Sequence, residues 1–169
     1  QFGFKRLYYA FQSAPGGIAH ALALTEEFAA GSPIAVILGD NIFTSFLQRM
    51  GENFLRQKLG ARVLLTKVSH PGAYGCPNIG IQHQIVSIEE KPKEPKSPYA
   101  VTGLYFYDSQ VYNLIRQLKC SPRGEMEITD LNNLYAMYGT LLYDIYTGFW
   151  GDAGESIEAL QKVSQGVMK

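Results

Sequence analysis

Two aspartates stand at positions where a protein could hold a hard cation. Asp40 follows the apolar run at 35–38, and Asp152 follows the aromatic pair at 149–150, with a glycine next to each aspartate. Carboxylates brought together at the ends of strands make a site for Mg2+, which takes one or two carboxylates together with phosphate oxygens. Asp40 also has a structural alternative, because an aspartate at this place could cap the helix expected after it at 42–58.

Three charged residues could meet a phosphorylated sugar. Lys91 and Arg123 lie in turn-rich segments, where a phosphate could be bound through charge-assisted hydrogen bonds. Glu90, beside Lys91, could accept hydrogen bonds from sugar hydroxyls. Each has an ordinary alternative, since loop cations are usually solvated and a glutamate at a strand end is usually a surface charge. The residues alone therefore indicate an α/β protein with a candidate Mg2+ and phosphate site.

The element that must position Asp40 is the apolar run at 35–38. Four apolar residues between a Ser-Pro pair and a glycine predict a strand buried on both faces, as in the centre of a parallel sheet. The carboxyl end of such a strand is where open α/β sheets bind ligands. A second buried strand is expected at 62–68, and helices at 18–30 and 43–58. This alternation predicts right-handed crossovers between strands.

A glycine-rich loop precedes the first of these helices. A short strand is expected at 7–11, followed by the turn-rich segment 12–17, which ends in Gly16 and Gly17. Glycines ahead of a helix leave backbone N–H groups free and give a flat ligand room to approach. The same pattern also suits an ordinary strand-to-helix turn, so the loop alone does not decide between the two.

The second half of the chain supplies the elements around the other candidate residues. Residues 69–84 are expected to be irregular, and Pro77 argues against an unbroken central strand there. Gly103 lies inside a predicted strand, at a point where a neighbouring group could come close. The patterns predict strands at 85–89, 99–107, 141–146 and 149–152, and helices at 110–118, 125–138 and 156–168, the last capped by Ser156.

The bulk composition narrows the class of protein. The 169 residues include 15 Lys plus Arg and 15 Asp plus Glu, so net charge gives no reason to expect nucleic-acid or membrane-surface binding. Cys76 and Cys120 have no metal-ligand spacing and form no disulfide framework, which favours reduced thiols in a cytoplasm. No apolar run is long enough to span a bilayer. The length favours a single domain, 1–169, and the start at Gln1, without Met, leads us to expect a fragment.

Six longer motifs follow one another along the chain. They are QSAPGGIAHA at 12–21, LGDN at 38–41, YG at 74–75, SIEEKP at 87–92, YAVTGLYFYD at 99–108 and SPRGEMEITD at 121–130. Together they resemble the sugar-1-phosphate nucleotidylyltransferases, and most closely the thymidylyl-transferring members of that family. The last two motifs are highly specific, whereas LGDN alone would be weak. Their order and approximate spacing fit the family across nearly the whole chain.

The resemblance implies a fold and a set of site residues. The fold is a Rossmann-like three-layer α/β/α nucleotidyltransferase with a mixed, mostly parallel sheet, of which the N-terminal part is missing from this chain. In the family, matching residues hold the thymine base, the glucose ring, the sugar phosphate and Mg2+. Here they are Gln12 and Gly17 for the base, Tyr74, Gly75, Glu90 and Val101 for the sugar, Lys91 and Arg123 for the phosphate and its chemistry, and Asp40 and Asp152 for the metal.

The reaction that the resemblance implies is nucleotidyl transfer. An oxygen of glucose-1-phosphate attacks the α-phosphorus of dTTP, and pyrophosphate leaves without a covalent enzyme intermediate. Catalysis would consist of positioning and charge neutralisation by Lys, Arg and Mg2+. The resemblance further implies dTTP and glucose-1-phosphate as partners, a cytoplasmic homo-oligomer that is a tetramer in the family, and a role in dTDP-sugar and polysaccharide biosynthesis.

The sequence departs from the family pattern in three places. The family's Gly-rich loop with its Arg, and a later Lys, cradle the triphosphate, and neither occurs in these residues. After Tyr74 and Gly75 the chain continues Cys-Pro-Asn-Ile, which leaves open the family's local hairpin and the sugar contact of Gly75. After Trp150 it reads Gly-Asp-Ala-Gly-Glu, which keeps the aspartate but lacks two neighbouring hydroxyls.

Two hypotheses of different class follow from these departures. In the first, the chain is the carboxyl-terminal two-thirds of an enzyme that is active only at full length. In the second, it is a non-catalytic sugar-phosphate-binding or assembly module that has lost its nucleotide loop. A glycine-rich loop encoded in frame before Gln1 would establish the first, and a genuine start codon near Gln1 would favour the second.

Overall fold

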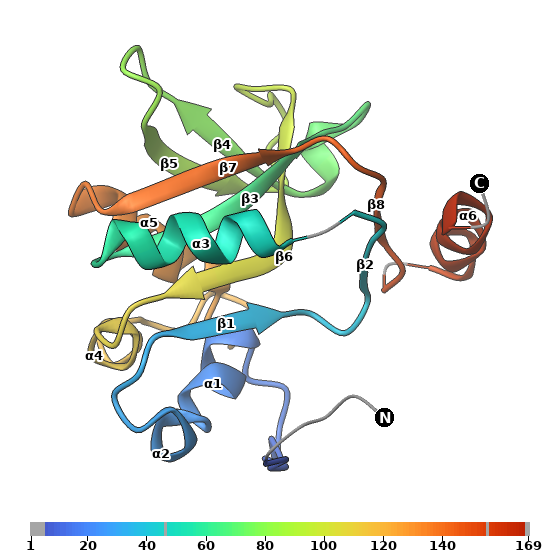
Figure 1. The fold of residues 1–169 in the computed structure, drawn as a ribbon. Helices are drawn as coiled ribbons and strands as arrows, with labels where there is room; N and C mark the ends of the chain where they lie inside the picture. The colour runs from blue at the N-terminus through green and yellow to red at the C-terminus, as the bar shows by residue number, and fades with distance from the viewer. Residues whose placement is uncertain (1–5, 46, 155, 168–169) are drawn as a thin grey trace.

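A four-stranded mixed sheet forms the centre of the molecule (Figure 1). The computed structural model describes residues 6–45, 47–154 and 156–167. In that part of the chain the strands lie in the order β1 (Ile34–Ile37), β6 (Tyr99–Tyr107), β3 (Ala61–Lys67) and β7 (Leu141–Tyr146). β6 runs antiparallel to both β1 and β3, and β7 runs parallel to β3. The sheet is mixed, as predicted, but parallel pairing does not predominate among the described strands.

Shorter elements surround this sheet. β2 (Asn41–Phe43) pairs with β8 (Trp150–Asp152), and β4 (Gly75–Ile79) forms an antiparallel hairpin with β5 (Ile85–Glu90). The helices are α1 (Ile18–Ala23), α2 (Glu26–Ala29), α3 (Gln48–Gln57), α4 (Val111–Ile115), α5 (Ile128–Met137) and α6 (Ile157–Val167), and the 3-10 turn η1 (Pro71–Ala73) precedes β4. In Figure 1 the β2–β8 ladder lies between the sheet and α6.

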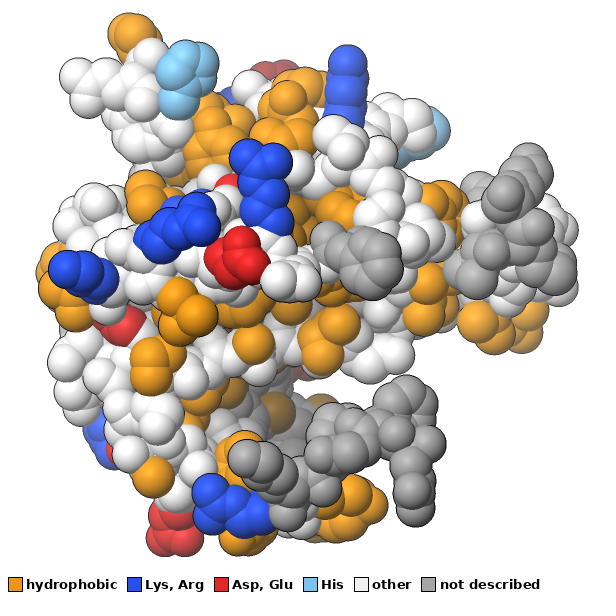
Figure 2. Space-filling model, in the orientation of Figure 1, with side chains coloured by type: hydrophobic (Ala, Val, Ile, Leu, Met, Phe, Trp, Pro, Cys, Tyr) orange, Lys and Arg blue, Asp and Glu red, His pale blue; other side chains and the backbone are white. Residues whose placement is uncertain are grey.

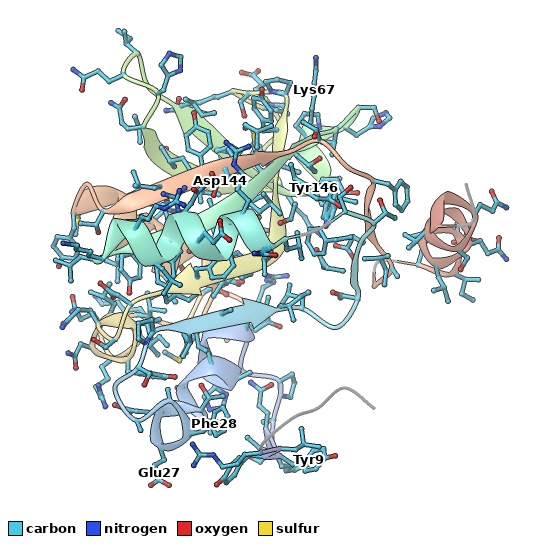
Figure 3. The ribbon with its side chains drawn as sticks, in the orientation of Figure 1. Tyr9, Glu27, Phe28, Lys67, Asp144 and Tyr146 are labelled. Carbon is cyan, nitrogen blue, oxygen red and sulfur yellow. The ribbon has the colours of Figure 1, made fainter. Side chains whose placement is uncertain are left out.

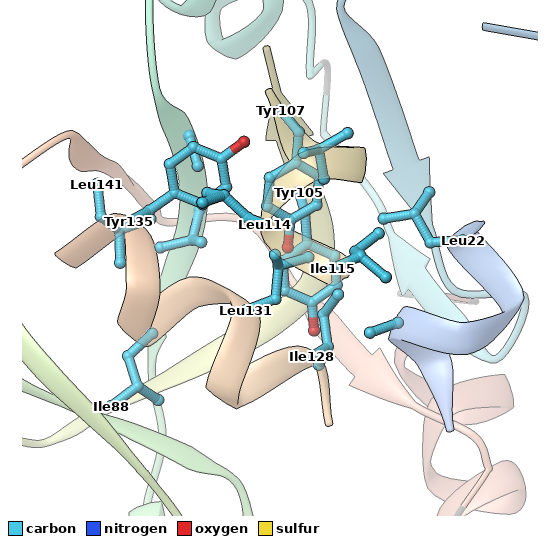
Figure 4. Packing of buried hydrophobic residues seen from close by; sticks show 14 of the residues in the cluster. Leu22, Ile88, Tyr105, Tyr107, Leu114, Ile115, Ile128, Leu131, Tyr135 and Leu141 are labelled. Carbon is cyan, nitrogen blue, oxygen red and sulfur yellow. The ribbon is translucent and has the colours of Figure 1, made fainter. Parts of the chain in front are cut away.

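Helices cover both faces of the sheet and bury its apolar side chains. α1, α4 and α5 cover one face, where they pack around Tyr105 and Leu131 (Figure 4). α3 covers the other face, where Met50 packs with Leu64 and Leu104. Neighbouring residues of β3 and β6 divide between the two clusters because successive side chains of a strand point to opposite faces. The result is the three-layer α/β/α arrangement that the sequence predicts.

A polar network ties α3 to the sheet. On β7, Asp144 accepts hydrogen bonds from Asn53 of α3 (2.8 Å) and from Arg62 of β3 (3.0 Å) (Figure 3). The side chain of Arg62 is only 10% exposed, so its charge is paired where water has little access. Above this network, Lys and Arg side chains gather over α3 and β7, with apolar side chains scattered between them (Figure 2).

β1 departs furthest from the sequence prediction. The apolar run at 35–38 does contain a strand, but β1 lies at the edge of the described sheet and its side chains alternate between partly buried and exposed. Ile37 is 57% exposed. The prediction of a central strand in a parallel sheet is therefore wrong for the described chain, because an apolar run signals burial without naming the neighbour that provides it. The strand predicted at 7–11 is also absent from the described residues, and Phe11 is 87% exposed.

The helix predicted at 43–58 begins late. It starts only at Gln48, because Ile42 and Phe43 pair with β8 instead of entering the helix. Asp40 is therefore separated from α3 by a strand and is not its cap. This removes the structural alternative that the sequence left open for Asp40.

Three other predicted helices are shorter than expected, and the one predicted at 110–118 is reduced to α4. The helix at 18–30 breaks between α1 and α2, where the Thr25 hydroxyl donates to Leu22 O (2.7 Å) and so competes with the helical backbone. The helix at 125–138 begins at Ile128, and Glu125 and Glu127 lie ahead of its first turn, where both pair with a neighbouring arginine.

The hairpin that the sequence left open does form. Pro77 lies inside β4, which pairs with β5 alone among the described strands, so the missing N–H of proline breaks no central ladder. The strands predicted at 62–68, 85–89, 99–107 and 141–146 are confirmed within a residue or so. The Ser156 cap is also confirmed, since the Ala159 N–H donates to its Oγ (3.1 Å), whereas Met168 lies outside the described residues.

Candidate active site

A cavity of about 130 Å³ lies where the β4–β5 hairpin, β6, β8 and α5 come together. Four residues predicted from the sequence line it, and they are Gly75, Glu90, Val101 and Asp152. Side chains to which the sequence gave no role complete the wall, among them Asn41, Tyr105, Thr129, Asn132 and Trp150. The fold thus brings predicted sugar-binding and metal-binding residues from separate parts of the chain to one space.

The β2–β8 ladder brings the two predicted metal ligands to the same corner. Asn41 lies opposite Asp152 in this ladder, so Asp40 directly precedes the residue that faces Asp152. The Ala153 N–H donates to Asp40 O (2.8 Å), and the Asp40 carboxylate lies against Gly154, where any Cβ would collide with it. Asp152 Oδ1 accepts from the Gly154 N–H (2.9 Å). Backbone pairing, rather than a helix, therefore positions both carboxylates.

Negative charge is concentrated on one side of the cavity. Tyr105 is 5% exposed, and its burial raises the pKa of the phenol well above its ordinary value. Glu90, Asp152 and Asp40 raise that pKa further, so all three carboxylates act on the same buried group. A cation is favoured where carboxylates gather in this way.

The two aspartates fit the protein's share of a Mg2+ site. The described residues contain no group of three or more His, Cys, Asp or Glu side chains arranged to hold a metal ion. Mg2+ does not require one, because it usually binds through one or two carboxylates and takes its remaining ligands from substrate phosphates and water. Asp40 is exposed and Asp152 partly exposed, which leaves room for such ligands.

Glu90 is oriented by α5. The Thr129 hydroxyl donates to Glu90 Oε2 at 2.7 Å, and Thr129 is the second residue of that helix. Gly75 lies opposite Glu90 in the hairpin, and a Cβ added there would stand 3.4 Å from the same oxygen. A sugar hydroxyl that approached this wall would therefore meet a carboxylate already held in one orientation.

The predicted base-binding loop is joined to the predicted phosphate-binding loop. Gln12 Nε2 donates to Gly17 O (3.2 Å) and lies 2.8 Å from His20 Nδ1. Gly17 has a φ of 87°, and a Cβ there would lie 2.5 Å from Met126 O, so this close approach requires glycine. The Met126 N–H in turn donates to Gly16 O (2.8 Å). Met126 belongs to the SPRGEMEITD motif, so the two loops are held side by side.

Lys91 and Arg123 lie outside the lining of the 130 Å³ cavity. Arg123 has a 64% exposed side chain, and its Nη2 pairs with Glu127 (2.9 Å) and Glu125 (3.5 Å). Its hydrogen bond to Glu127 is the main reason that its pKa is raised, and the charges of the two glutamates add to this. Lys91 has a positive φ of 44°, and its N–H donates to Tyr74 O (3.1 Å). An incoming phosphate would thus compete with Glu125 and Glu127 for the Arg123 guanidinium, or would share it with them.

Tyr74 lines a neighbouring cavity of about 450 Å³ rather than the smaller one. Its ring meets the Trp150 ring edge-on, with centroids 5.1 Å apart. Trp150 and Asp152 line both cavities, so the two spaces meet at these residues. The larger cavity extends toward α6, where Ala159 and Val163 form part of its wall.

Sequence reasoning missed several polar residues at this site, among them Asn41, Thr129 and Trp150. Asn41 and Thr129 lie inside quoted motifs, and Trp150 lies two residues before Asp152. Their chemistry was not distinctive, because an amide, a hydroxyl and an indole gain a role only from the partners that the fold brings to them.

The family of the chain follows from comparison with known proteins. Residues 2–169 match the family model described as nucleotidyl transferase, and the chain belongs to this family. A glucose-1-phosphate thymidylyltransferase of Actinoplanes sp. is 40% identical over 160 residues, which cover 94% of this chain and 53% of that protein. The protein of the same description from Neisseria meningitidis is 44% identical over 150 residues, covering 86% of this chain and 52% of that protein. The chain therefore spans about half the length of these two relatives.

Solved structures agree with this placement. A Bacillus anthracis protein described as a glucose-1-phosphate thymidylyltransferase, solved with a sucrose, superimposes with a TM-score of 0.87 at 49% identity, over 95% of this chain and 64% of that one. A UDP-glucose pyrophosphorylase complexed with UDP-glucose gives a TM-score of 0.85 at 23% identity, over 95% of this chain and 65% of that one, and supports the fold alone. The Rossmann-like nucleotidyltransferase fold is thereby confirmed.

Within the part of the chain that the structure describes, no helix has both the length and the apolar character needed to cross a membrane.

Proposed function

We propose that a full-length protein containing this chain transfers the thymidylyl group of dTTP to glucose-1-phosphate and releases pyrophosphate. The observation that carries the proposal is the 130 Å³ cavity, in which Gly75, Glu90, Val101 and Asp152 share one wall. The identity of 40–49% to proteins described as glucose-1-phosphate thymidylyltransferases supports the choice of substrates. Because the chain spans only about half of such relatives, the activity is assigned to the full-length protein.

In this proposal the cavity takes the sugar. Glu90, oriented by Thr129, accepts hydrogen bonds from glucose hydroxyls. Gly75 and Val101 supply a wall without polar side chains, so that the ring can lie close to the backbone of β4 and β6. Trp150 closes one side of the cavity, and the edge-on contact of Tyr74 with its ring stiffens this apolar surface.

The loops beside the cavity take the phosphates and the base. Lys91 and Arg123 neutralise the sugar phosphate and hold its oxygen for attack on the α-phosphorus of dTTP. A new P–O bond forms to glucose-1-phosphate as the bond to pyrophosphate breaks, and pyrophosphate carries away the electron pair. Gln12 and Gly17 hold the thymine edge, in a loop fixed through Met126 to the arginine loop.

Asp40 and Asp152 would hold Mg2+ in this scheme. When bound, Mg2+ supplies positive charge against the phosphate oxygens, which is its usual contribution to phosphoryl-transfer chemistry. The two aspartates fix where that charge lies, because β2 and β8 fix the aspartates. A homo-oligomeric assembly is part of the same proposal and rests on the family resemblance alone.

The test is pyrophosphate release by the full-length protein from dTTP, glucose-1-phosphate and Mg2+. We expect turnover that depends on both substrates and that falls when UTP replaces dTTP. Saturable binding of glucose-1-phosphate without any pyrophosphate release would instead identify a sugar-phosphate-binding module. Equal turnover with UTP would remove the thymidylyl specificity while leaving nucleotidyl transfer in place.

A further inference from the structure

Asn41 makes three side-chain hydrogen bonds at the candidate site. It is 7% exposed, and its Oδ1 accepts two hydrogen bonds of 2.7 Å, from the Gly103 N–H and from the Trp150 indole N–H. Its Nδ2 donates to Asp40 Oδ1 at 2.8 Å. One amide therefore joins a predicted metal ligand, an aromatic wall of the cavity and the backbone of β6.

The orientation of this amide follows from its partners. An N–H group can only donate, so the two N–H donors of Gly103 and Trp150 must face the amide oxygen. The amide NH2 is then directed at the Asp40 carboxylate, which accepts from it. A flipped amide would set its NH2 against both N–H groups and its oxygen against the carboxylate, losing all three bonds.

The backbone of β6 is shaped to receive Asn41. Where β6 pairs with β3, four residue steps of β6, from Val101 to Tyr105, span only two of β3, from Val63 to Leu65. Gly103 lies in this bulge, and its N–H meets Asn41 while its carbonyl accepts from the Leu38 N–H (2.9 Å).

No side chain is accommodated at Gly103 without moving Asn41. A Cβ added there would stand 2.6 Å from Asn41 Cγ and 2.7 Å from both amide heteroatoms. Gly103 has no positive φ in this structure, so an alanine would suit the backbone, and the three atoms nearest to its Cβ all belong to Asn41. The missing side chain of Gly103 therefore leaves the space that the Asn41 amide occupies.

From these contacts we propose that Asn41 is a positioning residue that locks the Asp40 carboxylate to the Trp150 indole and so sets the geometry in which the metal is bound. The inference rests on the proposed function, because it takes Asp40 as a metal ligand. Partners that orient a ligating carboxylate typically change metal affinity or activity 10–100-fold when they are removed. Asn41 stands in that relation to Asp40.

Two substitutions in a full-length protein containing this chain test the proposal by independent routes. Asn41→Ala removes the amide, and Gly103→Ala displaces it while keeping every functional group of the site. Binding of Mn2+, which takes the same oxygen ligands as Mg2+, is measured through water proton relaxation without substrates. We expect about 10–100-fold weaker binding in both variants. The double variant should bind Mn2+ no more weakly than Asn41→Ala alone, because both act through one side chain.

The Trp150 indole N–H resonance gives a second readout that is independent of metal and turnover. It is identified in the NMR spectrum by its loss in Trp150→Phe. We expect it to move in both variants, since the 2.7 Å hydrogen bond to Asn41 is lost or displaced. Asn133→Ala is the matched control, because the Asn133 amide joins α5 to Ile88 through two hydrogen bonds (2.7 and 2.9 Å). It should lower stability while leaving Mn2+ affinity and the indole resonance unchanged.

The outcomes separate this inference from the proposed function. A parent protein that turns over dTTP, with folded variants that bind Mn2+ within twofold of the parent, would overturn the role of Asn41 and leave the activity standing. An unshifted indole resonance in Asn41→Ala, or Mn2+ effects of the two substitutions that simply add, would overturn it as well. A parent that releases no pyrophosphate refutes the proposed function, and the indole resonance then still decides whether Asn41 holds Trp150.

Discussion

Removing the hydroxyl of Thr129 should weaken sugar recognition without disturbing the nucleotide side. Thr129→Val keeps the branched shape of the side chain and deletes the donor that lies 2.7 Å from Glu90 Oε2. A hydrogen bond to a charged group contributes about 1.5–3 kcal/mol. Glu90 is exposed and water can partly replace the lost donor, so we expect a loss near the lower end of this energy range. A change of about 1.4 kcal/mol corresponds to a roughly tenfold loss of affinity.

The assay is steady-state pyrophosphate release by the full-length protein with glucose-1-phosphate and dTTP varied in turn. We expect kcat/KM for glucose-1-phosphate to fall roughly tenfold, while KM for dTTP stays near the parental value. Thr66→Val is the matched control, because its hydroxyl donates to Tyr146 O (3.3 Å) within the sheet and touches no predicted ligand. If both variants keep kcat/KM for glucose-1-phosphate within twofold of the parent, the orientation of Glu90 by Thr129 has no part in recognition.

Three further outcomes test the rest of the site and the fold. Asp40→Asn and Asp152→Asn should each lower kcat about 10²–10³-fold at saturating Mg2+, because each removes one charge from the metal site. Circular dichroism should show the fold intact in both variants. Near-parental turnover would instead mean that the substituted aspartate is structural. The 169-residue chain by itself should release no pyrophosphate, because it lacks the family's Gly-rich triphosphate loop, and any release dependent on dTTP would contradict this. The same chain should associate through the exposed edge of β1, so Ile37→Lys should reduce light scattering relative to the parent chain, whereas Lys at the exposed Leu55 of α3 should not.

The elements of the fold were predictable where a short pattern determines them. β3 and β6 are long apolar runs, and their strands appear at the predicted places. Their pairing was not predictable, because the choice of neighbour depends on segments far apart in the chain. β1 shows the difference, since its residues form a strand whose partners are β6 on one side and no described strand on the other.

The start of the helix predicted at 43–58 was wrong for a related reason. Ile42 and Phe43 continue an apolar pattern that suits a helix, yet they pair with β8, which lies more than 100 residues later in the chain. A three-residue ladder is too short to leave a periodic signal of its own. Asp40 and Asp152 come to one corner through this same ladder, because Asn41, the residue after Asp40, pairs with Asp152.

For predicting close contacts at the site, glycines in the sequence were more informative than polar side chains. The sequence marks Gly103 as a place where another group comes close, and Asn41 is that group. The sequence cannot name the partner, because a missing side chain records that space is needed and not what fills it. Arg123 shows the opposite case, in which the charge was visible but its pairing with Glu127 depended on where α5 begins.

The residues that line the 130 Å³ cavity are spread over most of the chain. Every residue that lines the 130 Å³ space falls between Ile18 and Asp152, and each comes from an element packed on β6 or joined to it through Asn41 or α5. Under the proposed function, the described strands and helices thus supply the lining of the sugar cavity. The nucleotide side is different, because Gln12 and Gly17, which the resemblance assigns to the base, do not line this cavity. Under the proposed function, losing Asn41 should therefore affect the sugar cavity through Trp150 and the metal site through Asp40.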